Sequence, residues 1–260
     1  MLRRTDRPGY TLLELLVVIA IMAVLIGLLA AVLGSARSVA RDLDCYNDLA
    51  QLDIAVSLFT QSSNPSLDRP GFLPSEFDPS GGDVASQSFI LKMFPNSGGK
   101  LKLPAAKLQG DEALVLLLGG PNQQGWSSNG RDPATAHQPG VEQILPFYTF
   151  KANRLVDPDG NGYPSYCDTF GEPIAYFSTW HWNNNRWAQT GYGPDCPRLG
   201  VQPYANESRY SWQLISAGSN RRFGQAGAVW TPGAGPTVYP PKSDGADDLA
   251  NFTFRLGRTR

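Results

Sequence analysis

The sequence predicts an α+β fold, in which one long N-terminal helix packs on a small antiparallel sheet with long Gly/Pro-rich loops. The apolar run from Leu15 to Leu33 carries no charge, and proline is absent between Pro8 and Pro65. Short aromatic segments bounded by Gly, Pro or Asn follow in the C-terminal half, as is typical of strands. The 260 residues include 27 glycines and 21 prolines but only 17% charged residues. This composition favours loops and short strands over a helix bundle.

The apolar run is long enough to cross a membrane. As a helix, its 19 residues reach about 30 Å, the thickness of a bilayer's hydrocarbon core. Arginines at positions 3, 4 and 7 precede the run, and positive charge tends to stay in the cytoplasm, so the chain after Leu33 is expected outside. The expected organisation is a leader (1–9), a transmembrane half-helix (10–34), an amphipathic half-helix (35–63) and an extracytoplasmic domain (64–260).

The helix is expected to continue beyond the membrane, from about Thr11 to Ser62. After Gly34, apolar residues recur at spacings of four and three, the pattern of one buried helical face. They are Cys45, Leu49, Leu52, Val56 and Phe59. Polar and charged residues lie off this stripe: Arg41, Asp44, Asp48, Gln51 and Gln61. We interpret Cys45 as a small buried apolar residue.

The other expected elements are short. Residues 64–83 and 122–140 are interpreted as loops, and 224–247 as a Gly/Pro-rich insertion. Residues 110–121 are expected to form a short buried helix that begins at Asp111 and is stopped by glycine. The strand candidates are Leu145 to Phe150, Ile174 to Trp182, Ser211 to Ser216 and Asn251 to Phe254.

The start of the apolar helix carries a specific motif. The segment Gly9-Tyr10-Thr11-Leu12-Leu13-Glu14, behind its basic leader, resembles the processing motif of type IV pilins and of the pseudopilins of type II secretion. The resemblance implies that a membrane prepilin peptidase cuts after Gly9 and methylates the new amino group of Tyr10. It also implies that Glu14 serves in assembly.

The physical chemistry of this segment agrees with the resemblance. A carboxylate at the cytoplasmic edge of an apolar stretch is costly without a partner. The amino group of Tyr10 in one subunit could pair with Glu14 of the next and set the stagger of subunits in a filament. Two alternatives remain open. Glu14 could snorkel in a plain signal anchor, or a signal peptidase could cleave near Gly34-Ser35-Ala36.

Residues 157–168 fit a calcium loop of the EF-hand type. Oxygen-bearing side chains fall at the required spacing, and Gly162 takes the place of the sharp turn. The expected ligands are Asp157, Asp159, Asn161, the carbonyl of Tyr163, Ser165 and Asp168. The alternative is an Asp/Asn/Gly turn that binds no metal.

Three later segments resemble, in their order, the C-terminal half of the major, G-type pseudopilin: 168–176, 212–220 and 247–252. In that family a turn and an acidic pair hold calcium. The resemblance implies a second calcium site formed by Asn220 and by Asp247 or Asp248, with Asp244 as a further candidate and carbonyls near Leu214. An asparagine at 220 in place of an aspartate should weaken calcium binding. The alternative is a loop closed by hydrogen bonds alone.

The chain has three cysteines, and an oxidising compartment would allow two of them to pair. We expect a disulfide between Cys167 and Cys196, closing a loop of roughly 30 residues and contributing about 3–4 kcal/mol through loop-closure entropy. Cys45 would remain free and buried.

No catalytic motif is present, so we expect no enzyme activity, and a net charge of −1 gives no sign of nucleic-acid binding. The expected protein is a single-pass inner-membrane subunit of a type II secretion pseudopilus or a pilus-like filament that drives protein export. Its implied partners are copies of itself, other pseudopilins, membrane lipid, the prepilin peptidase, an inner-membrane platform and a cytoplasmic secretion ATPase.

A membrane-anchored, calcium-dependent module for a glycan or a protein is the alternative function, and an anchored hydrolase comes third. The binding module would use the aromatic segment Trp180–Trp187 as a platform for sugar rings. Such a cluster is more often a packed hairpin, which is the interpretation we favour.

Overall fold

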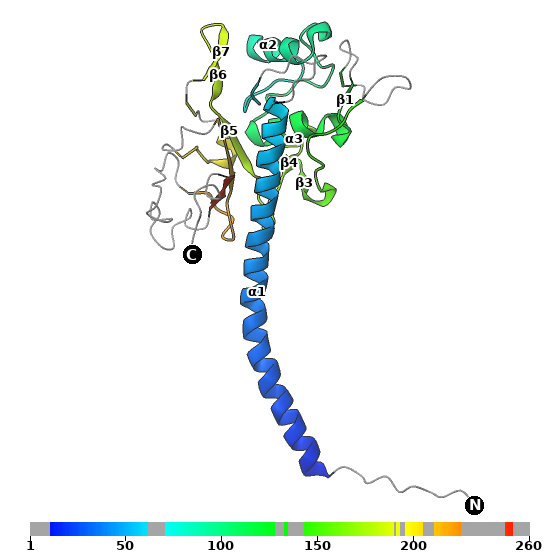
Figure 1. The fold of residues 1–260 in the computed structure, drawn as a ribbon, viewed down its shortest axis with the longest axis vertical. Helices are drawn as coiled ribbons and strands as arrows, with labels where there is room; N and C mark the ends of the chain where they lie inside the picture. The colour runs from blue at the N-terminus through cyan, green and yellow to red at the C-terminus, as the bar shows by residue number, and fades with distance from the viewer. Residues whose placement is uncertain are drawn as a thin grey trace, which may run out of the picture. The chain divides into compact units, whose positions relative to one another are not determined.

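The computed structural model describes residues 11–61, 71–127, 133–134, 143–189, 191–192, 196–204, 211–224 and 248–251. The chain forms two compact units, Met1–Arg41 and Asp42–Arg260. Helix α1, Leu12–Gln61, begins in the first unit and ends in the second (Figure 1). The predicted helix from about Thr11 to Ser62 is therefore confirmed.

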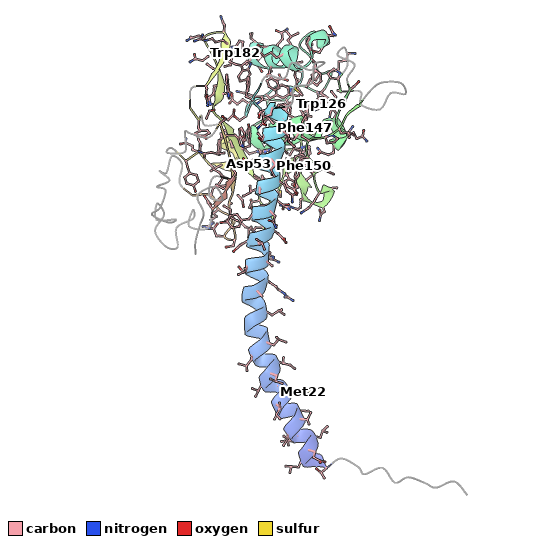
Figure 2. The ribbon with its side chains drawn as sticks, in the orientation of Figure 1. Met22, Asp53, Trp126, Phe147, Phe150 and Trp182 are labelled. Atoms are coloured by element: carbon pink, nitrogen blue, oxygen red, sulfur yellow. The ribbon has the colours of Figure 1, made fainter. Side chains whose placement is uncertain are left out.

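In the first unit, the part of α1 from Leu12 to Leu29 is apolar, and its described side chains are exposed. Leu12–Leu29 is long and apolar enough to cross a membrane, and none of it is buried. Figure 2 shows Met22 and its neighbours pointing outward from the helix. Because this surface has no protein cover, it needs lipid or another protein around it.

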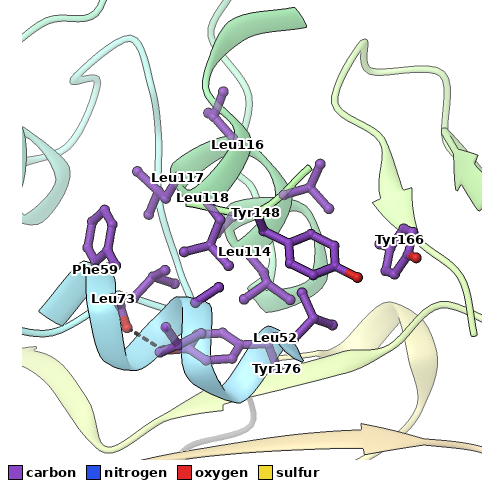
Figure 3. Packing of buried hydrophobic residues seen from close by; sticks show 14 of the residues in the cluster. Leu52, Phe59, Leu73, Leu114, Leu116, Leu117, Leu118, Tyr148, Tyr166 and Tyr176 are labelled. Atoms are coloured by element: carbon purple, nitrogen blue, oxygen red, sulfur yellow. Dashed lines mark hydrogen bonds between the residues drawn. The ribbon is translucent and has the colours of Figure 1, made fainter. Parts of the chain in front are cut away.

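The second unit is built around the predicted apolar stripe of α1. Its five members, Cys45, Leu49, Leu52, Val56 and Phe59, are each 0% exposed. They share one core with α3, Gly110–Gly119, whose ten residues are all buried, and with Tyr176 of strand β5, Ala175–Ser178 (Figure 3). The hydroxyl of Tyr176 donates to the carbonyl of Leu73 (2.8 Å), which ties the loop before α2 to this core.

Helix α3 confirms the short buried helix but corrects its beginning. Gln109, not Asp111, is the N-cap residue, and its backbone N–H donates to Oε2 of Glu112 (3.0 Å). Asp111 and Glu112 occupy the first turn, where negative charge interacts favourably with the helix dipole. The helix ends at Gly119, and Gly120 adopts a φ of +74°, as a glycine stop permits.

The main sheet is antiparallel and small. Its order is β5-β8-β9, with β8 at Trp212–Ser216 and β9 at Leu249–Ala250. Among the described residues, three two-stranded pairs accompany it: β1 (Trp126–Ser127) with β2 (Gln143–Ile144), β3 (Leu155–Val156) with β4 (Ser165–Tyr166), and β6 (Trp180–Asn183) with β7 (Arg186–Gln189). The helical elements besides α1 and α3 are α2 (Val84–Met93) and the 3-10 helices η1 (Pro95–Ser97), η2 (Pro121–Gln123), η3 (Ala152–Arg154) and η4 (Pro197–Leu199).

The strand predictions have mixed outcomes. The strand at 211–216 is confirmed as β8, and 174–182 is divided at Thr179 into β5 and β6. The predicted strand at 145–150 is wrong: it contains Pro146, which has no N–H for a ladder, and the N–H of Phe147 donates to Leu118 instead (2.8 Å). The last strand, β9, lies just before the predicted 251–254, of which 252–254 fall outside the described residues.

Helix α2 lies directly after the predicted loop at 64–83, whose described part, 71–83, holds no helix or strand. Asp83 caps α2, and its Oδ1 accepts from the N–H of Ser86 (2.8 Å). The predicted loop at 122–140 contains β1 among its described residues. Nearly all of the insertion predicted at 224–247 lies outside the described residues.

Candidate functional site

Glu14 lies in the first turn of α1, and the local sequence explains its position. Its Oε2 accepts from the backbone N–H of Thr11 (2.8 Å) and from the Thr11 hydroxyl (3.0 Å), and Thr11 Oγ1 accepts from the N–H of Glu14 (3.2 Å). This reciprocal pair is a capping box, which satisfies donors that the helix cannot pair itself. Glu14 is exposed beside Leu12 and Leu13, so its carboxylate is accessible to another chain. The predicted processing residues Gly9 and Tyr10 lie outside the described residues.

The candidate calcium loop begins as a tight turn around Asp157. The two oxygens of Asp157 accept from the backbone N–H groups of Gly160 and Gly162, both at 2.9 Å. The N–H of Gly162 is the main reason that the pKa of Asp157 is lowered. Both glycines have positive φ, 70° and 87°, which this turn requires. The Asp157 carboxylate therefore closes the turn itself.

The side chains of Asp159 and Asn161 point to protein partners. Asp159 Oδ2 accepts from Nδ2 of Asn161 (3.1 Å) and lies 3.3 Å from the Arg198 guanidinium. Asn161 Nδ2 also donates to Oε1 of Glu112 (2.9 Å), and Asn161 Oδ1 accepts from the N–H of Tyr163 (2.7 Å). The hydroxyl of Tyr163 donates to the carbonyl of Pro104 (2.6 Å).

The later ligand candidates turn away from the loop. Ser165 Oγ donates to Oδ2 of Asp111 (2.7 Å). Asp168 is buried, and its Oδ1 accepts from the N–H groups of residues 170, 171 and 172 at 2.8–3.0 Å. Its Oδ2 accepts from the hydroxyl of Ser216 in β8 (2.5 Å). Both oxygens of Asp168 therefore have protein donors outside the loop, and its role as a calcium ligand stays a prediction.

Arg198, in η4, connects this loop to the start of α3. Its guanidinium forms ion pairs with Asp111, with Glu112 (3.0 Å) and with Asp159 (3.3 Å), and donates to Ser165 Oγ (3.0 Å). Burial raises the pKa of the Glu112 carboxyl above its ordinary 4.5. The sequence analysis missed this cluster, although an adjacent acidic pair in the first turn of an otherwise apolar helix was a visible signal.

The second predicted calcium region is only partly described, because Asp244 and Asp247 lie outside the described residues. Asp248 is buried, and its Oδ2 accepts from the Tyr204 hydroxyl (2.8 Å) and from the N–H of Gly224 (3.1 Å). Asn220 is exposed and caps its own turn through the N–H of Arg222 (2.7 Å), while the N–H of Leu214 donates to Asn251 (3.0 Å). Within the described part of the chain, no group of three or more His, Cys, Asp or Glu residues could hold a metal. Calcium binding in this region stays a prediction.

The predicted disulfide between Cys167 and Cys196 is not formed, and all three cysteines are free and buried. Cys196 lies against β5, where its thiol donates to the carbonyl of Tyr176 (3.6 Å). Cys167 pairs across a bridge with Pro173, and the Cys45 thiol donates to Ser216 (3.3 Å). A separation of roughly 30 residues permits a disulfide loop but does not bring two Cβ atoms to bonding distance. Here the fold holds each thiol in its own set of contacts.

The aromatic segment Trp180–Trp187 is the packed hairpin that we favoured. Its strands β6 and β7 pair across Asn184 and Asn185, which adopt φ values of 48° and 60°. The Trp180 ring stacks on Phe72 at 4.8 Å between centroids, and Trp187 contacts Phe72 (5.0 Å) and Trp182 (5.7 Å). The three indole rings are therefore half-buried and support one another.

Two acidic residues of α1 that the sequence analysis did not single out attach the helix to its domain. Asp48, placed off the apolar stripe, is buried, and its carboxylate pairs with Arg154 and with Lys151 (3.1 Å). Asp53, labelled in Figure 2, accepts from Nε1 of Trp212 and from Nδ2 of Asn251, both at 2.8 Å. A charge beside an apolar stripe looks the same in sequence whether it faces water or a buried cation.

Comparison with known proteins bears on the N-terminal segment. Residues 4–30 match the prokaryotic N-terminal methylation motif, which covers residues 4–9 of the leader, Glu14 and most of the apolar run. No curated protein and no solved structure matches the chain. The methylation motif and the long apolar helix that follows it together fit a type IV pilin-like protein.

Proposed function

We propose that this chain is a structural subunit of a type II secretion pseudopilus or a type IV pilus-like filament, cut after Gly9 and polymerised to drive protein export. The observation that carries the proposal is the position of Glu14. It is an exposed carboxylate in the first turn of an apolar helix, inside the matched methylation motif. That motif is typical of proteins processed as prepilins.

Membrane energetics supports an assembly role for Glu14. Around α1 the described surface from Leu12 to Leu29 is apolar and unburied, so Glu14 is a charge on a surface suited to lipid. A carboxylate there is unfavourable unless a cation neutralises it. Cleavage after Gly9 creates an ammonium group at Tyr10, four residues before Glu14 in the chain. In a filament, the ammonium group of one subunit would neutralise Glu14 of its neighbour, and this favours the assembled state.

The proposed topology places residues 1–9 in the cytoplasm and the domain outside the inner membrane, because the leader is basic. The subunit then needs no active site of its own. A prepilin peptidase would process it, and a cytoplasmic ATPase acting through an inner-membrane platform would supply the energy for polymerisation. Other pseudopilins and further copies of this chain would be its partners in the filament.

The packing of the aromatic hairpin favours this role over that of a glycan-binding module. A sugar platform presents the face of an aromatic ring to solvent, whereas the ring of Trp180 is stacked on Phe72. Trp187 makes tilted or edge-on ring contacts with Phe72, Phe89 and Trp182. These rings contribute to the core of the domain.

The proposal is tested by replacing Glu14 in cells that contain the cognate peptidase and secretion platform. Glu14→Ala should still be cut and reach the membrane, but it should yield no filaments in the sheared fraction and should block export of the secreted substrate. Glu76→Ala, which removes an exposed glutamate from the domain, is the matched control and should behave as wild type. Equal filament yields from the two variants would contradict the proposal.

A further inference from the structure

We propose that the guanidinium of Arg198 is the resident cation of the acidic loop at 157–165, and that this loop folds without a bound metal ion. The spacing of the loop predicts calcium, but the structure directs its polar groups to the protein. The inference does not rest on the proposed filament role, because it concerns only the folding of the extracytoplasmic unit.

The contacts of Arg198 carry the inference. One guanidinium reaches three carboxylates and one hydroxyl: Asp111, Glu112 (3.0 Å), Asp159 (3.3 Å) and Ser165 (3.0 Å). The backbone N–H of Arg198 also donates to Oε1 of Gln109 (3.0 Å), the residue that caps α3. The same residue therefore binds the start of α3 and two positions of the candidate metal loop.

Burial makes a cation necessary at this place. The side chains of Asp111 and Glu112 are 0% and 1% exposed. Desolvated carboxylates this close to one another are unfavourable unless a positive charge lies between them. Arginine suits the position because its planar fork carries several donors in fixed directions and stays charged. Its own side chain is 19% exposed, so its pairs with Asp111 and Glu112 lie largely out of water, whereas the side chain of Asp159 is 42% exposed.

The loop groups are oriented for a donor rather than for a metal. Calcium takes six to eight oxygen ligands. Asn161 turns its amide nitrogen toward Glu112, and the hydroxyl of Ser165 donates to Asp111. The oxygens of Asp157 close their own turn, and those of Asp168 face the 170–172 backbone and Ser216. The expected ligands therefore do not converge on one point.

Thermal unfolding of the full-length protein in detergent tests the inference, with near-UV circular dichroism as the readout. For wild type we expect the same Tm in chelator and in calcium. Arg198→Met, which keeps an unbranched apolar stem but loses the charged guanidinium, should lower Tm by about 10 °C, because it leaves buried carboxylates without a cation. Arg198→Lys should lower Tm by less than Arg198→Met does, because lysine keeps a positive charge at this position. Arg186→Met, at an exposed arginine of β7, is the control and should leave Tm unchanged.

Two results would overturn the inference. The first is a wild-type Tm that rises with calcium and no longer does so in Asp159→Ala, which removes the ligand oxygen and would show that the loop binds the ion. The second is equal Tm values for Arg198→Met and Arg198→Lys, which would reduce the role of Arg198 to packing. A calcium response that persists unchanged in Asp159→Ala would come from another region and would agree with the inference. If Arg198→Met does not fold, the comparison of wild type with Asp159→Ala decides the question.

Discussion

Arg154 donates to the buried carboxylate of Asp48, a residue of α1 that precedes it by 106 positions. The Nε of the same guanidinium donates to the carbonyl of Cys167 (2.7 Å), and its Cζ lies 4.6 Å from the centre of the Tyr166 ring. Arg154 therefore joins the amphipathic half of α1 to β4 and to the chain that follows it. In a filament subunit, the rest of the domain would be attached to this amphipathic half of α1.

Replacing Asp48 should destabilise the domain strongly. The side chain of Arg154 is only 13% exposed. Asp48→Ala leaves its guanidinium without the carboxylate that it pairs with. Loss of one partner of a buried pair costs about 3–5 kcal/mol in the free energy of unfolding. Denaturant unfolding of the detergent-solubilised protein measures the loss. Asp44→Ala, on the exposed side of the same helix, should change stability little, and similar losses from both variants would refute the assignment.

The three thiols should be inert in the native protein. Burial raises the pKa of Cys45 and of Cys167 to about 11, and that of Cys196 to about 12. At pH 8 about one thiol in a thousand, or fewer, is then the reactive thiolate. We expect no alkylation by iodoacetamide before unfolding, and three labels after unfolding without reductant. A single label after unfolding would show that two of the cysteines are joined in a disulfide.

Glu112 should give the protein a pH-dependent stability above pH 4.5. Because burial raises the folded-state pKa of Glu112, the folded protein binds this proton more tightly than the unfolded chain does. The free energy of unfolding should therefore fall as the pH rises from 4.5 through the raised pKa. Glu112→Gln cannot titrate and should flatten this part of the profile, whereas Glu76→Gln, at an exposed position, should not. A profile unchanged by Glu112→Gln would contradict the assignment.

The sequence predicted correctly those elements whose formation depends mainly on residues close together in the chain. The stripe from Cys45 to Phe59 repeats at helical spacing, and every member is buried as its pattern requires. The glycine stop of α3 and the hairpin at 180–187 follow from short-range propensities in the same way. The processing motif could also be recognised from the sequence, because its residues are contiguous.

Pairings between distant residues were not predictable from one sequence. Nothing in the spacing shows that Asp48 meets Arg154, or that Arg198 meets Asp111. The disulfide prediction failed for the same reason: the outward topology and the place of Cys45 on the apolar stripe left Cys167 and Cys196 to pair, but neither gives the distance between their Cβ atoms. The calcium loop had the expected residue types at the expected spacing, but their directions depend on what packs beside them.

The central claim, that this is a processed pilin-like subunit, is tested most directly by the mass of its N-terminal peptide. The protein is purified from cells that contain its prepilin peptidase, digested and analysed by mass spectrometry. The account predicts a peptide that begins at Tyr10 and carries one methyl group on its amine. An intact Met1 would contradict the account, and so would a terminus at Arg37, which would instead show cleavage by a signal peptidase after Ala36.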